Sequence, residues 1–118
     1  TDDTSTPVVP NVTRVWELTA SDPHYRVELV AGQHQSFTDA CAYLDVLPTV
    51  PPEVQAVIGP TIESQAAAGC GPGIMEIERA EELTNTFAIT FLDSVFRDAD
   101  MIDADTTEIP DDVVFMAK

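Results

Sequence analysis

A chain of 118 residues, 44% of them apolar, is long enough for one domain with a modest core. Five basic against 21 acidic side chains give a formal charge of −16, which repels nucleic-acid phosphates and anionic membrane surfaces. No apolar run approaches the roughly 20 residues that cross a bilayer, and no signal-peptide pattern opens the chain. The composition predicts a soluble polypeptide, either an acidic secreted protein or one kept soluble at high salt.

The chain is expected to begin with a loop, because residues 1–10 are polar, acidic and contain two prolines. A short amphipathic helix follows over 11–18, where apolar residues including Trp16 recur at near-helical spacing. The run Ser-Asp-Pro at 21–23 ends it.

The stretch 25–39 combines a strand pattern, a tight turn with one histidine, and a helix start. Apolar and polar residues alternate up to Gly32, where we expect the strand to end. A helix is expected to begin near Phe37, capped by Ser36. His34 then lies on a short connection between two rigid elements, where a proton-transferring imidazole can be held in position. The alternative is an ordinary loop histidine.

The helix after His34 is expected to stop at Pro48. Residues 49–73 are rich in proline and glycine, which predicts a lid-like excursion with short helical turns. From 75 to 96 a wide apolar stripe predicts a long helix, and this polypeptide provides little surface against which the stripe could pack. Residues 98–118 are mostly acidic, so we expect a tail that packs only partly.

The two cysteines, Cys41 and Cys70, are predicted to form a disulfide. It would close a loop of about 30 residues and contribute on the order of 3 to 4 kcal/mol in the chain-entropy model. Two buried free thiols are the alternative. Cys70 lies in a Gly/Pro-rich loop, where a cross-link is useful, so we favour the disulfide and with it a secreted or extracytoplasmic location.

Three segments together resemble a known family. The run Gly-Gln-His-Gln-Ser-Phe-Thr-Asp at 32–39 resembles the catalytic-histidine segment of α/β-hydrolases of the platelet-activating factor acetylhydrolase and dienelactone hydrolase-like group. Cys-Gly-Pro-Gly at 70–73, followed by Glu-Arg-Ala and a Phe-rich helix, is similar to the C-terminal end of bacterial members. The opening run to Pro7 resembles their Gly-x-x-Asp-x-x-x-Pro acid loop without its glycine. Asp3 matches the acid by its spacing to Pro7, with Asp2 as the alternative.

The resemblance covers residues 1–97 and implies the C-terminal part of an α/β-hydrolase fold, with one to two strands plus helices. A preceding segment or partner chain would carry most of the sheet. The family's nucleophile is a serine in Gly-x-Ser-x-Gly, and this pentapeptide does not occur here. His34 and Asp3 would thus be the base and the acid of a triad whose serine another segment or chain supplies.

The activity implied by the resemblance is carboxylic-ester hydrolysis through an acyl-serine, by a serine esterase or lipase-like enzyme that is incomplete in this chain alone. The substrate would be a small-molecule or lipid ester, and no cofactor is expected. No metal site is expected either, since the acidic residues of 98–105 lack a calcium loop's glycine and closing glutamate. The alternative is a small acidic binding or structural protein without chemistry, which the missing nucleophile favours.

Overall fold

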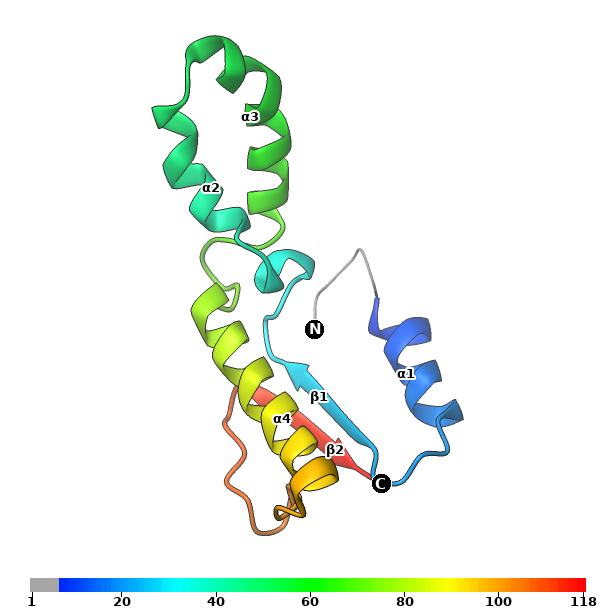
Figure 1. Ribbon diagram of the computed structural model, residues 1–118. Coiled ribbons are helices and arrows are strands. Elements are labelled where there is room, and N and C mark those ends of the chain that lie inside the picture. The colour runs from blue at the N-terminus through cyan, green and yellow to red at the C-terminus, as the bar shows by residue number, and fades with distance from the viewer. Residues whose placement is uncertain (1–6) are drawn as a thin grey trace.

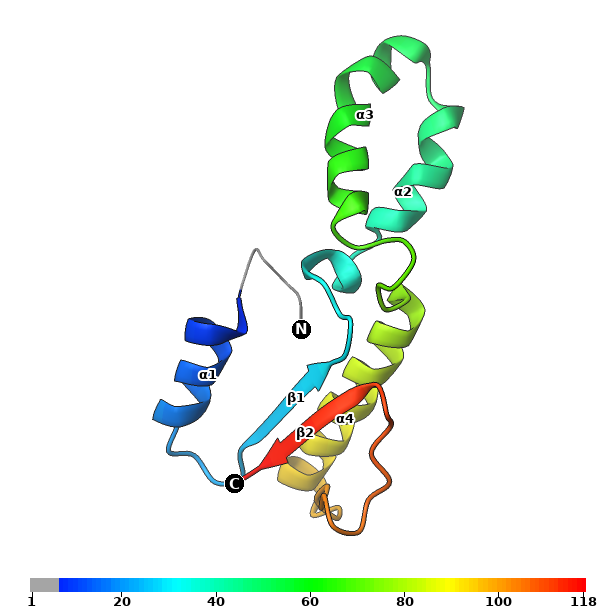
Figure 2. The same cartoon turned by 180° about the vertical axis from the view of Figure 1, so that it is seen from behind.

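The computed structural model describes residues 7–118 as a small mixed helical domain with a two-stranded antiparallel sheet (Figure 1). In chain order the elements are α1 (Val8–Leu18), β1 (Tyr25–Leu29), the 3₁₀ helix η1 (His34–Phe37), α2 (Ala40–Val46), the 3₁₀ helix η2 (Leu47–Thr49), α3 (Pro52–Ala67), α4 (Ile77–Arg97) and β2 (Val113–Ala117). The α4 helix lies against the strands, whereas α2 and α3 project away from them (Figures 1 and 2). Within the described residues, no helix is both long and apolar enough to span a membrane.

Two of the expected helices are confirmed. The helix predicted over 11–18 is α1, but it begins at Val8, within the segment 1–10 that was expected to be loop, and its backbone is non-helical at Val9, just before Pro10. The long helix predicted over 75–96 is α4. The predicted strand is β1, although it ends at Leu29 and not near Gly32.

The prediction of a tail over 98–118 is wrong, because this segment supplies the second strand. The β2 strand pairs antiparallel with β1, with Tyr25 opposite Ala117 and Leu29 opposite Val113. The five residues of β2 are apolar and include β-branched and aromatic side chains, which suit a pleated surface. The paired strand β1 lies more than 80 residues earlier in the chain. The strand was therefore not predicted from the acidic segment 98–118, because only its pairing with β1 stabilises it.

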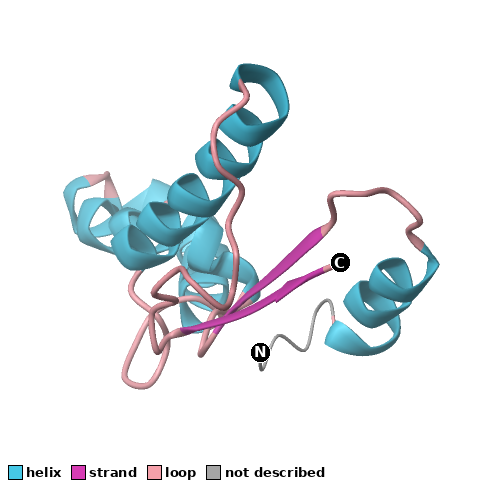
Figure 3. Cartoon of the chain, turned by 90° about the horizontal axis from the view of Figure 1, so that it is seen from below, coloured by secondary structure: helices cyan, strands magenta, loops and turns pink. Residues whose placement is uncertain are grey.

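The core lies between α4 and the two strands, which are seen along a second direction in Figure 3. It consists of the buried side chains of Leu29, Met75, Ala80, Leu83, Phe87, Ile102 and Val113. Around it, the Tyr25 ring lies 5.1 Å from that of Phe115 and 5.4 Å from that of Phe91. The C-terminal part of the α4 stripe is not covered within residues 7–118, and Phe96 remains 77% exposed.

The segment 49–73 contains one regular helix, α3, where short helical turns were expected. Pro52 occupies the start of α3, where a missing N–H costs nothing. Pro60 lies inside the helix and removes one backbone hydrogen bond without ending it. The α3 helix returns alongside α2, so the two form a helical hairpin (Figure 2). Whether residues 49–73 act as a lid stays a prediction.

Candidate functional site

The chain turns sharply after β1, and His34 follows this turn as the first residue of η1. Ala31 adopts the left-handed conformation, with φ of 59°, and its carbonyl oxygen accepts a hydrogen bond of 3.0 Å from the Met75 N–H. The Gly32 N–H donates to the Leu29 carbonyl oxygen at 3.1 Å. A Cβ added at Gly32 would lie 3.2 Å from that oxygen, so the tight return favours glycine.

His34 is the exposed first residue of η1. The expected helix start near Phe37 is wrong, because η1 ends at that residue and α2 begins only at Ala40. Ser36 is not the N-cap of a helix that starts at Phe37; it is the third residue of η1, and its side chain forms a capping box with Gln33. Its hydroxyl oxygen accepts from the Gln33 N–H at 2.9 Å, and its side chain is 0% exposed. The backbone next to the imidazole is thereby anchored in the interior while His34 faces outward.

Asp3 and its alternative Asp2 lie outside the described residues 7–118. The first described element after them in the sequence is α1, which runs antiparallel to β1 (Figures 1 and 2). The N-terminal end of α1 thus lies at the same end of β1 as the turn that carries His34. The pairing of Asp3 with His34 remains a prediction.

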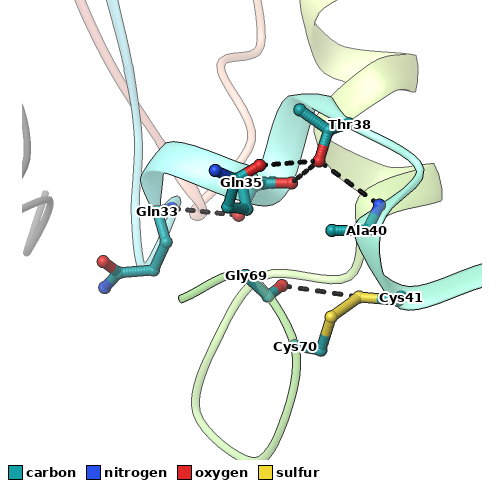
Figure 4. Close-up of a disulfide and its surroundings, with 8 residues drawn as sticks. Gln33, Gln35, Thr38, Ala40, Cys41, Gly69 and Cys70 are labelled. Carbon is teal, nitrogen blue, oxygen red and sulfur yellow. Dashed lines mark hydrogen bonds between the residues drawn. A yellow bond between two sulfur atoms is a disulfide. The ribbon is translucent and has the colours of Figure 1, made fainter. Parts of the chain in front are cut away.

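The predicted disulfide between Cys41 and Cys70 is confirmed (Figure 4). The two Cα atoms are 5.9 Å apart, and the bond joins the first turn of α2 to the loop after α3. The residue before Cys70, Gly69, is buried against η1: a Cβ added there would lie only 2.4 Å from the Cβ of Gln35. The cross-link therefore ends directly behind the turn that carries His34.

The sequence did not reveal two apolar cavities that flank β1. A cavity of about 440 Å³ lies between α1 and β1 and is lined by Val12, Val15, Trp16 and residues 24–27, among others. A second, of about 420 Å³, lies between β1 and α4 and is lined mainly by aliphatic and aromatic side chains, Phe37 of η1 among them. Tyr25 and Val27 border both cavities. The apolar face predicted over 11–18 was the available signal, since Val12, Val15 and Trp16 line the first cavity.

The edge of β1 between these cavities is open within the part of the chain that the structure describes. His24 and Lys118 exchange both of their backbone hydrogen bonds, at 2.9 and 3.0 Å. Because such pairs alternate along an antiparallel ladder, the N–H and C=O groups of Tyr25 and Val27 point away from β2. The sheet of residues 7–118 has only two strands, so this edge can accept a further strand.

No family model, curated protein or solved structure matches this chain. Among residues 7–118, no group of three or more His, Cys, Asp and Glu side chains is placed to hold a metal ion. The arrangement offers one accessible imidazole on an anchored turn, which is suited to transferring a proton to or from a group presented by another molecule or segment.

Proposed function

We propose that this chain is the acid- and histidine-bearing part of a serine hydrolase of the platelet-activating factor acetylhydrolase and dienelactone hydrolase-like group. The observation that carries the proposal is the placement of His34: exposed, directly after a strand, on a turn that the buried Ser36 anchors. A general base needs this combination of access and fixed position.

In the proposed reaction, His34 removes the proton from a serine hydroxyl as its oxygen attacks the ester carbonyl carbon. The imidazolium then returns the proton to the departing alcohol, leaving an acyl-serine. Water, activated by the same imidazole, hydrolyses that ester and regenerates the serine. Asp3 accepts a hydrogen bond from the other ring nitrogen and stabilises the imidazolium.

The serine and the oxyanion-hole donors would come from a larger segment or chain that carries Gly-x-Ser-x-Gly. Ser36 cannot serve as the nucleophile, because its hydroxyl is buried and bonded to the Gln33 N–H. The open edge of β1 and the two cavities beside it support such a partner. A strand placed along that edge would direct alternate side chains into the two cavities, as a strand buried on both faces does. The disulfide supports an extracytoplasmic location for the complex.

The alternative function is that of a small acidic binding or structural protein. The missing nucleophile favours it, and so do the apolar side chains left exposed on α1 and α4, which suit a protein contact without chemistry. The two functions differ in whether any serine becomes reactive when the partner is bound.

The test is to isolate the chain from its source without denaturation, identify polypeptides that co-purify, and measure hydrolysis of p-nitrophenyl butyrate. We expect a partner with Gly-x-Ser-x-Gly that reacts with a fluorophosphonate probe. His34→Ala should lower kcat by about 10³-fold or more. His24→Ala is the matched control for the loss of an imidazole. The His24 ring lies 4.4 Å from that of Trp16 at the other end of β1 and lines the cavity beside α1, so its removal should affect partner binding at most and leave kcat of the assembled complex unchanged.

The acid is assigned by comparing Asp3→Asn with Asp2→Asn in the same complex. A large loss of kcat in the first only would support Asp3. Ester hydrolysis that is equal in native protein and His34→Ala would refute the hydrolase proposal. A stable complex without any fluorophosphonate-reactive serine would favour the binding function instead.

A further inference from the structure

We infer that the helical hairpin of α2 and α3 positions the His34 turn, acting through Gly69 and the Cys41–Cys70 disulfide. This inference deepens the proposed function, since it assigns positioning residues to the proposed base. It concerns the geometry of the turn, however, and can be measured without the missing nucleophile.

The first element of this device is the contact between Gly69 and Gln35, the residue that follows His34. A Cβ at position 69 would lie 2.4 Å from the Gln35 Cβ and 2.9 Å from its carbonyl carbon. The obstacle is partly main chain, so a side chain at 69 cannot be accommodated by rotating Gln35 alone. Gly69 is buried, and its backbone thus forms a wall directly behind η1.

The second element fixes that wall to the end of α3. The Gly69 and Cys70 N–H groups both donate to the Ala66 carbonyl oxygen, at 3.0 and 2.7 Å. Cys70 is then bonded to Cys41, and the Gly69 carbonyl oxygen lies 3.8 Å from the Cys41 sulfur (Figure 4). The loop cannot withdraw from η1 without carrying the start of α2 with it.

The third element closes the ring on the side of η1. The Thr38 hydroxyl donates to the Gln35 carbonyl oxygen at 2.9 Å and accepts from the Ala40 N–H at 3.3 Å. A continuous path therefore runs from Gln35 through Thr38 to α2, across the disulfide to Cys70, and back to Gln35 through Gly69. His34 is bonded directly to one member of this ring, so its backbone position depends on the ring remaining closed.

The experiment uses the 118-residue chain and measures the turn by NMR. Two readouts are followed: hydrogen exchange of the Ser36 amide, which donates to the Gln33 carbonyl oxygen at 3.1 Å, and the chemical shifts of the His34 ring protons. Amides of α4 serve as an internal reference for global folding. The perturbations are Gly69→Ala and, separately, reduction of the disulfide by a phosphine, which converts it to two thiols.

We expect both perturbations to speed exchange of the Ser36 amide by about tenfold or more, with α4 protection retained, because a cross-link lost from one region opens that region locally. The His34 ring shifts should move in both. Gly59→Ala is the matched control and should change neither readout, since a Cβ there meets only a Leu47 methyl at an ordinary 3.7 Å.

Unchanged Ser36 exchange and His34 shifts in the reduced, folded chain would overturn the inference. If Gly69→Ala does not fold, the reduced native chain decides alone. The outcome is separable from the hydrolase proposal. If exchange becomes faster but the protein never hydrolyses esters, the hairpin positions the turn and the hydrolase proposal fails. If exchange is unaltered but the complex hydrolyses esters, the hydrolase proposal holds and the positioning inference fails.

Discussion

The two halves of this molecule are held together by different means. The sheet unit, which consists of β1, β2 and α4, buries Leu29, Leu83, Phe87 and other large side chains in one core. The hairpin of α2 and α3 buries mainly small residues, Ala40, Gly59 and Ala66 among them. One half is stabilised by apolar burial and the other depends on a cross-link, because small residues remove little apolar surface from water.

The exposed apolar residues sharpen this contrast. In the hairpin, Val57 is 76% exposed, and Tyr43, Val46 and Val54 are exposed as well. The outer face of α4 and four apolar residues of α1, Val9, Val12, Val15 and Leu18, are also exposed within residues 7–118. The sheet unit therefore buries one apolar core between α4 and the strands, and leaves a second set of apolar side chains exposed.

The largest effect is expected from Phe87→Ala in the sheet unit. Phe87 is 8% exposed and its ring lies 5.7 Å from that of Phe115, so its removal should lower the free energy of unfolding by about 3 to 5 kcal/mol. Urea denaturation followed by far-UV circular dichroism measures the loss. Ile89→Ala, at a site 56% exposed on the same helix, should cost less than about 0.5 kcal/mol. Equal losses at the two positions would mean that α4 is not packed on the sheet as described.

The next effect separates the two halves directly. Replacing both Cys41 and Cys70 by serine should destabilise the hairpin by about 3 to 4 kcal/mol in the chain-entropy model. Hydrogen exchange read by mass spectrometry should show faster exchange over α2 and α3, with β1, β2 and α4 close to native. Loss of protection in both halves together would show that they unfold as one cooperative unit.

The elements of the sheet unit were partly predictable from local sequence. The stripe of α4 repeats over five turns, and the alternation of β1 is bounded by Pro23 and Gly32, so both were found. The β2 strand was missed, since five apolar residues in an acidic segment become a strand only through pairing with β1. Strand propensity is decided by neighbours that a local window does not contain.

The candidate site likewise has features that were predictable from local sequence and features that were not. The position of His34 after a strand followed from the alternation that ends near Gly32. The disulfide followed from the presence of two cysteines, one of them in a Gly/Pro-rich loop. Two features were not predictable: the contact of Gly69 with Gln35 and the cavities on either side of β1. Both depend on how the hairpin and α1 pack against the rest of the chain.

Ser36 was expected to cap a helix because Asp39 follows it at the third position. Its hydroxyl instead accepts from the Gln33 N–H on its N-terminal side, an alternative local hydrogen bond that serine makes equally well.

A smaller effect is expected from Tyr25→Phe, which tests how the segment before β2 is attached to the sheet. The Tyr25 hydroxyl donates to the Ile102 carbonyl oxygen at 3.0 Å, and its loss should cost about 0.5 to 1.5 kcal/mol in urea denaturation. The pKa of Tyr25 is raised, chiefly by burial, which disfavours the phenolate. In an absorbance titration of the native protein, one tyrosine should therefore ionise at a pH above the ordinary tyrosine pKa. The absorbance change from that tyrosine should be absent in Tyr25→Phe. A titration without it would contradict the buried phenol.

The smallest effect concerns the ion pair that ties α4 to the start of β2. The Arg79 Nε and Nη2 atoms donate to the two carboxylate oxygens of Asp112 at 2.8 and 3.0 Å. These hydrogen bonds lower the pKa of Asp112, against a smaller opposing effect of desolvation. Both side chains are more than a third exposed, so solvent screens the pair and its contribution to stability is modest.

The sign of the pH dependence follows from that lowered pKa. Unfolded Asp112 binds a proton more tightly than folded Asp112, so the stabilisation is present above the unfolded pKa of about 3.9 and is lost as pH falls through the folded value. Asp112→Asn should therefore be less stable than native protein at pH 7, with the difference shrinking below about pH 4. Urea midpoints across this range measure it, and the exposed neighbour Asp111 supplies Asp111→Asn as a control that removes the same charge. An identical pH dependence in both variants would mean that the general reduction of the −16 charge, and not the Arg79 pair, determines the acid response.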